Sequence, residues 1–454
     1  MRRALLICAT LLGGCASVPL EDTATRAQIA DSSLPPMKLF GPTRPSAPAR
    51  SNANIAADFM SLHFQLESGR DLPVFTRFEM PITVRVTGKP SANLGADLSA
   101  LLGRLRQEAG IDIRQIARGD ANISIQAVSR ADIRRTLPQA ACFVVPNVSS
   151  LTEFRRKRHK PETNWALVRE RSHLAVFLPN DASPQEVRDC LHEELAQAIG
   201  PLNDLYRLPD SVFNDDNVHT VLTGFDMLIL RATYAPELRS GMSRAAVSAQ
   251  LPAILSRLNK AGNGVPVRRV QATPRSWIDD VQTALGPGAS AAARRTAANS
   301  AVRTAAELGW HDHRRAFSLY MLGRMTQVYD PAMAQGQYAS ALGFLGQTPG
   351  TDLHRAYIIT QTSAYAIATG DGKTALRQIA PALPVARRSE NASLLATLML
   401  LQAEAYDLTG QIDKARAVRL DSLGWARYGF GSDWAVRAKM QEIAGLSPHG
   451  KRGS

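Results

Sequence analysis

The residues best suited to chemistry lie in the stretch DCLHEELAQAIGPLNDLYRLPDSVFNDD. Glu193 and Gln197 are four residues apart, which places them on one face of a helix. Glu194 stands beside them, and Asn203 and Asp204 follow a Gly-Pro pair that should end the helix. Carboxylates and amides gathered in this way could ligate a cation, transfer protons or hydrogen-bond one another.

The spacing of these residues resembles a known zinc-peptidase pattern. Glu193-Glu194-x-x-Gln197-x-x-Gly200-x-x-Asn203-Asp204 is similar to the metzincin motif H-E-x-x-H-x-x-G-x-x-H-D except at the three metal ligands. The later stretch TGFDMLILRATYAPEL resembles the helix after the metzincin methionine turn. There Asp226 and Tyr234 match an Asp and Tyr pair, and Phe213 replaces the methionine. The resemblance implies a zincin-like α/β domain in which Glu194 would be the general base.

The replacement of the three histidines leaves the chemistry open. Zinc favours imidazole, thiolate and carboxylate ligands over neutral amides. His192 points about 100° around the helix from Glu193 and cannot substitute for it, whereas His219 could approach from the next segment. In the first hypothesis, Glu193, Gln197 and Asn203 form a buried hydrogen-bond network, and no cofactor is expected.

Two further hypotheses keep a metal ion. An oxygen-rich set of side chains could hold a hard divalent cation such as calcium; its members are Glu193, Gln197, Asn203, Asp204, Asp215 and Asp216. The protein would otherwise be a metal-dependent peptidase or hydrolase with atypical ligands and Glu194 as general base.

The N-terminus predicts export and lipidation. Residues 1–14 combine Arg2 and Arg3 with an apolar run, as secretory signal peptides do. The ending Leu-Gly-Gly-Cys resembles a bacterial lipobox, which implies lipidation of Cys15 and anchoring on the periplasmic face of the outer membrane. Residues 15–50 are rich in Ser, Thr, Ala and Pro and predict a flexible tether.

The cysteines fit an oxidising compartment. Cys8 leaves with the signal peptide and Cys15 carries the lipid, so Cys142 and Cys190 remain. In a periplasmic protein, this pair predicts a disulfide. Two separately buried thiols are the alternative.

Residues 51–262 predict an α/β domain. The segment PITVRVTG alternates apolar residues like a half-buried strand, and ANISIQAVSR, ACFVVPN and SHLAVFLPN are also strand-like. The motif helix follows, with Ser183 as its N-cap and Glu186 three residues later. Strands followed by one long motif helix are expected of a zincin-like mixed sheet. About residues 51–259 are similar to an uncharacterised family of bacterial lipoproteins known as a domain of unknown function, on the evidence of NDLYRLPDSVFNDDN and ELRSGM.

A linker at 263–275 precedes an alanine-rich, all-α region at 276–448. Three segments place a glycine five residues before an alanine: Gly336 with Ala341, Gly370 with Ala375, and Gly410 with Ala415. In SAYAIATGDGKTALRQI and AEAYDLTGQIDKARAVR this resembles tetratricopeptide repeats, with glycine in the turn and alanine at a close helix crossing. Such repeats mostly bind proteins or peptides.

The charge distribution argues against nucleic-acid binding. The formal net charge is +13, but the basic residues are scattered, and the one dense run, EFRRKRHK, has no interleaved aromatic platform. The sequence therefore predicts a lipid-anchored binding protein whose repeats recognise an envelope protein or peptide, with a hydrolase as the alternative.

Overall fold

Five strands form one mixed sheet in the computed structural model, which describes residues 34–41 and 45–448. The strand order is β2-β1-β3-β5-β4, with β4 antiparallel to β5 and the other neighbours parallel. The strands are β1 (Ile82–Gly88), β2 (Ile113–Gln115), β3 (Ile123–Val128), β4 (Phe143–Pro146) and β5 (Leu174–Pro179). Sequence periodicity predicts all of these except the three-residue edge strand β2.

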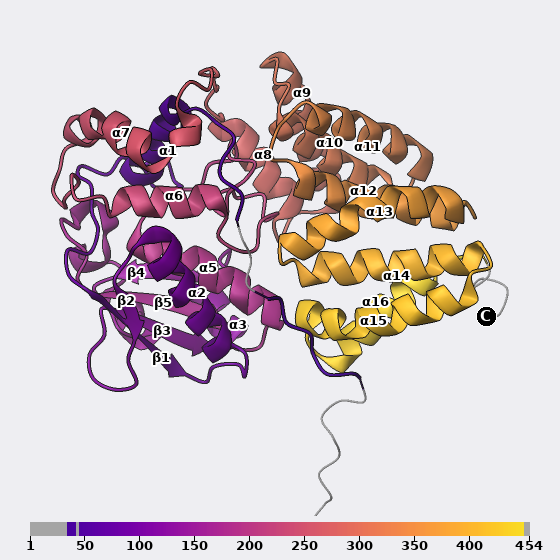
Figure 1. The fold of residues 1–454 in the computed structure, drawn as a ribbon, viewed down its shortest axis with the longest axis horizontal. Coiled ribbons are helices and arrows are strands. Elements are labelled where there is room, and N and C mark those ends of the chain that lie inside the picture. The colour runs from indigo at the N-terminus through magenta and orange to yellow at the C-terminus, as the bar shows by residue number, and fades with distance from the viewer. Residues whose placement is uncertain (1–33, 42–44, 449–454) are drawn as a thin grey trace, which may run out of the picture.

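Helices cover both faces of this sheet (Figure 1). One face carries the main core, built with α1 (Asn52–Phe64), α2 (Leu94–Ala109), α5 (Pro184–Ile199), α6 (Gly224–Thr233) and α7 (Arg244–Leu258). The other face is covered by the short helices α3 (Arg130–Thr136) and α4 (Leu151–Lys157). Along β5, Val176 contacts the main core and Phe177 the opposite one. This two-sided burial explains the continuous apolar sequence of β5.

A helical domain follows the α/β domain, as the sequence predicts. Its members are α8 (Arg275–Leu285), α9 (Ala291–Glu307), α10 (His313–Thr326), α11 (Pro331–Gly346), α12 (Asp352–Ala368), α13 (Gly372–Arg388), α14 (Ala392–Leu408), α15 (Ile412–Phe430) and α16 (Asp433–Ala444). Successive helices lie side by side (Figure 1). Within residues 34–41 and 45–448, no helix is long and apolar enough to cross a membrane.

The turn glycines of this domain agree with the sequence in two cases out of three. Gly370 and Gly410 have positive φ angles of 82° and 74° and separate consecutive helices. Gly336, the glycine of the first segment, instead lies inside α11 and marks no turn. The helix begins earlier, because Asp330 caps it and Pro331 occupies the first helical turn, where proline is tolerated.

The N-terminal half of α5 joins the two domains. Arg188 forms an ion pair with Glu390, at the turn between α13 and α14. Gln185 donates from Nε2 to Asn391 Oδ1 (3.1 Å), and its Oε1 accepts from the backbone N–H of Ser393 (2.8 Å). The N-terminal half of α5 is therefore fixed to the helical domain, whereas the motif residues lie in its C-terminal half.

Residues 34–41 and 45–50, here called the N-terminal strap, lie along both domains. The Lys38 N–H donates to the Gly424 carbonyl (3.1 Å), and the Phe40 ring lies 4.6 Å from that of Trp425. A Cβ on Gly224, the first residue of α6, would lie only 1.9 Å from the Ser46 carbonyl oxygen, so glycine permits this contact. Composition predicts a flexible tether here, whereas the described part is held by contacts. The signal sequence and Cys15 lie outside the described residues.

Candidate functional site

The motif helix α5 is held at its start by a cap and a disulfide. Ser183 Oγ accepts from the Glu186 N–H (3.2 Å), as the sequence predicts. Cys142, directly before β4, forms the predicted disulfide with Cys190 in α5. The disulfide ties the helix to the antiparallel edge of the sheet.

The end of α5 is held by a buried arginine, Arg171. Its guanidinium donates to three carbonyls, those of Gln197 (2.7 Å), Ala198 (2.9 Å) and Gly200 (2.5 Å). Tyr234 adds a hydrogen bond from its hydroxyl to the Ile199 carbonyl (3.0 Å). The carbonyls at a helix end have no partner within the helix, so these donors satisfy them. Burial lowers the pKa of Arg171 to about 10, at which the guanidinium is still charged at neutral pH.

Five acidic side chains converge beside the second half of α5. This carboxyl cluster consists of Glu67, Glu193, Glu194, Asp204 and Asp215. Glu67 and Asp204 hydrogen-bond each other, so one of the two must carry a proton. Both line a pocket of about 140 Å³ together with Asp215, Tyr206 and Arg275.

Burial raises the pKa of every carboxyl in this cluster. The pKa of Glu193 is raised to about 8, first by burial and then by the neighbouring Asp215 and Glu67. Burial also raises the pKa of Glu194 and of Asp204 well above their usual range. At neutral pH the Glu193 carboxyl is therefore mainly a neutral acid, which is a poor cation ligand and a poor base.

The motif amides Gln197 and Asn203 bind other partners than predicted. Gln197 donates from Nε2 to Asp204 Oδ2 (3.1 Å), and Asn203 donates from Nδ2 to the Ser61 carbonyl of α1 (3.1 Å). In residues 34–41 and 45–448, no hydrogen bond joins Glu193, Gln197 and Asn203 to one another. The predicted network of these three residues is therefore not formed, because Gln197 bonds the Asp204 carboxyl and Asn203 bonds the backbone of α1.

The two histidines near the motif have structural partners. His192 accepts the Leu222 N–H at Nδ1 (3.1 Å), and His219 donates from Nε2 to the Pro209 carbonyl (3.0 Å). Burial lowers the pKa of His192 well below its usual value and that of His219 to about 4. Both rings are therefore neutral and engaged in backbone contacts.

The remaining motif residues organise the loop between α5 and α6. Asp226 accepts from the Ser211 hydroxyl and from the backbone N–H groups of Val212 (3.1 Å) and Thr223 (2.7 Å). Phe213 is fully buried in the main core. Asp216 turns away from the carboxyl cluster and accepts from His354 Nε2 of α12 (2.8 Å). Of the two adjacent aspartates Asp215 and Asp216, Asp215 joins the cluster.

These residues do not fit a zinc ion. Gln197 and Asn203 use their NH₂ groups as donors, and the His192 nitrogen that could ligate accepts a backbone N–H instead. Across the described ranges, no three His, Cys, Asp or Glu side chains are arranged to hold a metal ion.

Sequence reasoning misses Glu67 and Arg171. Glu67 lies just after α1, more than 120 positions from the motif, and no spacing connects the two. Arg171 stands in the polar run VRERSH, where a buried arginine looks like its exposed neighbours. Only the folded chain shows which of these charges is buried.

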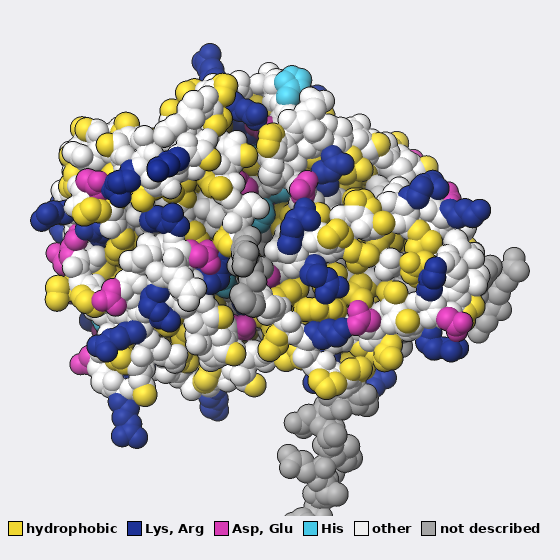
Figure 2. All heavy atoms as spheres, viewed as in Figure 1, with side chains coloured by type: hydrophobic (Ala, Val, Ile, Leu, Met, Phe, Trp, Pro, Cys, Tyr) yellow, Lys and Arg dark blue, Asp and Glu magenta, His cyan; other side chains and the backbone are white. Residues whose placement is uncertain are grey.

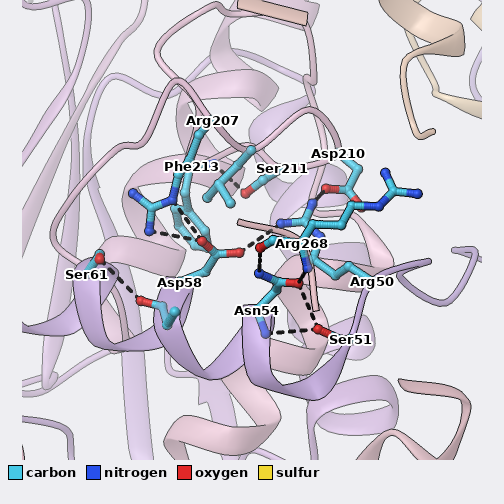
Figure 3. A network of polar contacts seen from close by, with 12 residues as sticks. Arg50, Ser51, Asn54, Asp58, Ser61, Arg207, Asp210, Ser211, Phe213 and Arg268 are labelled. Atoms are coloured by element: carbon cyan, nitrogen blue, oxygen red, sulfur yellow. Dashed lines mark hydrogen bonds and ion pairs between the residues drawn. The ribbon is translucent and has the colours of Figure 1, made fainter. Parts of the chain in front are cut away.

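A larger cleft, of about 760 Å³, lies between the two domains. Part of its wall is an ionic network in which Asp58 of α1 lies between two guanidinium groups (Figure 3). Asp58 accepts from Arg50 Nη1 (3.0 Å) and Arg207 Nε (3.0 Å), and Arg50 also pairs with Asp210. The strap thus contributes Arg50 to this wall, and the α5–α6 loop contributes Arg207.

Comparison with known proteins places the α/β domain but gives it no activity. Residues 52–253 match the model of a family described as "Protein of unknown function (DUF2927)". This segment runs from the first residue of α1 into α7. It includes the motif helix and every member of the carboxyl cluster. Searches of curated proteins and of solved structures returned no match.

Proposed function

We propose that the protein is a lipid-anchored binding protein on the periplasmic face of the outer membrane. Its α/β domain is a metzincin-like module without metal-dependent catalysis. Its helical domain is a tetratricopeptide-like repeat array that binds an envelope protein or peptide. Cys15 carries the anchor.

The observation that carries this proposal is the chain of hydrogen bonds at the former ligand positions. Gln197 donates to Asp204, and Asp204 bonds Glu67. The two motif amides are therefore occupied as donors, Gln197 to Asp204 and Asn203 to the backbone of α1. Amides engaged in this way stabilise the fold rather than presenting ligands.

The metzincin-like assignment is supported by the order and packing of the elements. Strand β5 leads directly into α5, and the chain turns back at Gly200 to bring Asn203 and Asp204 beside the helix. A Cβ on Gly200 would lie 2.7 Å from Leu230 Cδ2. Glycine therefore allows α6 to pack closely on the end of α5.

The proposed partner-binding role is supported by the helical domain. Ala375 and Ala415 are fully buried between neighbouring helices, as close crossings require. Between α10 and α11 and in the first turn of α11, Val328, Tyr329 and Met333 are more than half exposed. These apolar side chains offer contact area to a polypeptide.

One observation favours the rival function, a hydrolase that uses Glu194. Glu194 is buried, and its Oε2 has no hydrogen-bond partner among residues 34–41 and 45–448. An unsatisfied buried oxygen beside other carboxyls is an arrangement that a hard cation would complete. The binding function and the hydrolase function make opposite predictions for the Glu194→Gln variant.

The distinguishing experiment combines elemental analysis with the Glu194→Gln variant. Because burial raises the pKa of Glu194 and so favours the uncharged carboxyl, an amide of the same shape should leave folding unchanged. A binding protein should contain no stoichiometric metal and should not hydrolyse casein, with or without chelator. One equivalent of metal, with casein hydrolysis abolished in Glu194→Gln, would establish the hydrolase.

The anchor is tested by Cys15→Ser and cell fractionation. The variant should move from the membrane fraction to the soluble periplasmic fraction. If it stays with the membranes as wild type does, Cys15 is not the anchor.

A further inference from the structure

The cleft between the domains carries an excess of positive charge. Seven arginines and four aspartates line its 760 Å³. Figure 2 shows dark blue (Lys, Arg) and magenta (Asp, Glu) side chains along the junction of the two halves of the molecule, with cyan histidine between them. A volume of roughly 300–1,000 Å³ is typical of pockets for small molecules.

Most of these arginines are neutralised by the protein itself. Asp58 and Asp210 pair with Arg50 and Arg207. Arg314 pairs with Asp312, donates from Nη1 to the Gln271 carbonyl (2.9 Å) and lies 3.9 Å from the centre of the Trp310 ring. These contacts fix the cleft walls and leave their guanidinium groups little capacity for a ligand.

Arg268 and Arg269 are the exception. Neither side chain has an ion pair or hydrogen bond within the described residues, and both line the cleft. The backbone of Arg268 is held by Asn54 of α1, whose Oδ1 accepts its N–H (3.0 Å) and whose Nδ2 donates to its carbonyl (2.7 Å) (Figure 3). Two unpaired guanidinium groups are thus mounted on a fixed segment at the cleft.

A buried histidine supplies an independent sign of a missing partner. His313 lines the cleft and is only 3% exposed. Its Nε2 donates to the Tyr206 carbonyl (2.7 Å), and its Nδ1 has no partner in the part of the chain that the structure describes. A buried polar atom without a partner is uncommon in a folded protein and calls for a ligand or water.

We propose that this cleft binds a small molecule that carries phosphate or carboxylate groups. Arg268 and Arg269 bind the oxyanions, because the planar guanidinium matches both groups with paired N–H donors. His313 Nδ1 accepts a hydrogen bond from a hydroxyl or N–H elsewhere on the same molecule. This site is separate from the carboxyl cluster and from the repeat surface of the proposed function, and it joins the two domains through one ligand.

The experiment uses pyrophosphate and citrate as probes in titration calorimetry on the full chain. Arg268→Ala/Arg269→Ala should weaken binding of whichever probe binds by at least tenfold. Arg134→Ala/Arg135→Ala is the matched control, because it removes two adjacent exposed arginines on α3. The control should bind as wild type does.

The outcomes separate the ligand sources and the proposal from its failure. Binding of pyrophosphate alone identifies a phosphoryl ligand, and binding of citrate alone identifies a polycarboxylate. Binding of both probes identifies a general oxyanion site. Each of these results supports the proposal if Arg134→Ala/Arg135→Ala binds the probe as wild type does. Absence of saturable binding by either probe overturns it. Equal weakening in both double variants also overturns it, because net charge would then explain the binding. None of these results depends on the metal and peptidase measurements above.

Discussion

Arg188 of the motif helix and Glu390 of the helical domain form a buried ion pair across the domain junction, with side chains 10% and 7% exposed. The guanidinium of Arg188 also lies 6.0 Å from the centre of the Tyr428 ring of α15. One arginine therefore connects α5 to two parts of the helical domain. The geometry of the motif and the placement of the helices depend on each other.

Glu390→Gln should destabilise the protein by about 3–5 kcal/mol, because it leaves the buried guanidinium of Arg188 without its counter-charge. Urea unfolding measures the change. Glu237→Gln is the control, since it removes the partner of the half-exposed Arg257 and should change stability little. Equal losses of unfolding free energy in the two variants would show that the buried junction pair stabilises the protein no more than an exposed pair does.

Gln197→Ala should lower the free energy of unfolding by about 1–3 kcal/mol, because it strands the buried Asp204 carboxyl that accepts from the amide. Addition of a chelator should not change either protein. Gln107→Ala, at an exposed position on α2, should be nearly silent. A melting temperature of Gln197→Ala equal to that of wild type would mean that this hydrogen bond does not hold the motif.

Glu193 should make the protein less stable as the pH rises. Its pKa is raised from 4.5 to about 8 on folding, so between these values the folded state binds a proton that the unfolded state has lost. Stability from this group is present below pH 4.5 and is lost as the pH rises to about 8.

The variant Glu193→Gln cannot titrate and should lose this part of the pH dependence. The difference in unfolding free energy between variant and wild type should therefore move in favour of the variant from pH 5 to pH 9. Urea midpoints at pH 5, 7 and 9 test this, with the exposed Glu307→Gln of α9 as control. Parallel curves for wild type and Glu193→Gln would contradict the raised pKa.

Ala415→Leu should cost about 1–3 kcal/mol, because the alanine is fully buried between α14 and α15 and a larger side chain overpacks the crossing. Ala417→Leu is the matched control on the same helix, at an exposed position. Thermal unfolding distinguishes the two. Similar melting temperatures would argue that this crossing can open to admit a leucine.

Local sequence patterns predict the elements where one physical effect dominates. The alternation of Ile82 and Val84 predicts β1, and Ser183 with Glu186 predicts the start of α5. Gly370 and Gly410 mark turns because their positive φ angles favour glycine. Gly336 marks no turn, because Asp330 and Pro331 fix the start of α11 five residues earlier and a glycine is tolerated inside the helix.

The candidate site is only partly predictable, because burial and long-range contacts decide its chemistry. The motif identifies Glu193, Gln197 and Asp204 but not Glu67, which the fold brings from the end of α1. The predicted partners of Asn203 are wrong for the same reason, since its acceptor is a backbone carbonyl of α1. No periodic pattern encodes a contact over 142 positions.

The N-terminal strap has a consequence for the order of folding. Lys38 pairs with Asp421, a residue 383 positions later in the chain. A segment that emerges before either domain during synthesis therefore finds its binding site only after α15 has been made and packed. Contacts of such long sequence separation form slowly. Docking of the strap onto the two folded domains should therefore be the last step in forming the native state.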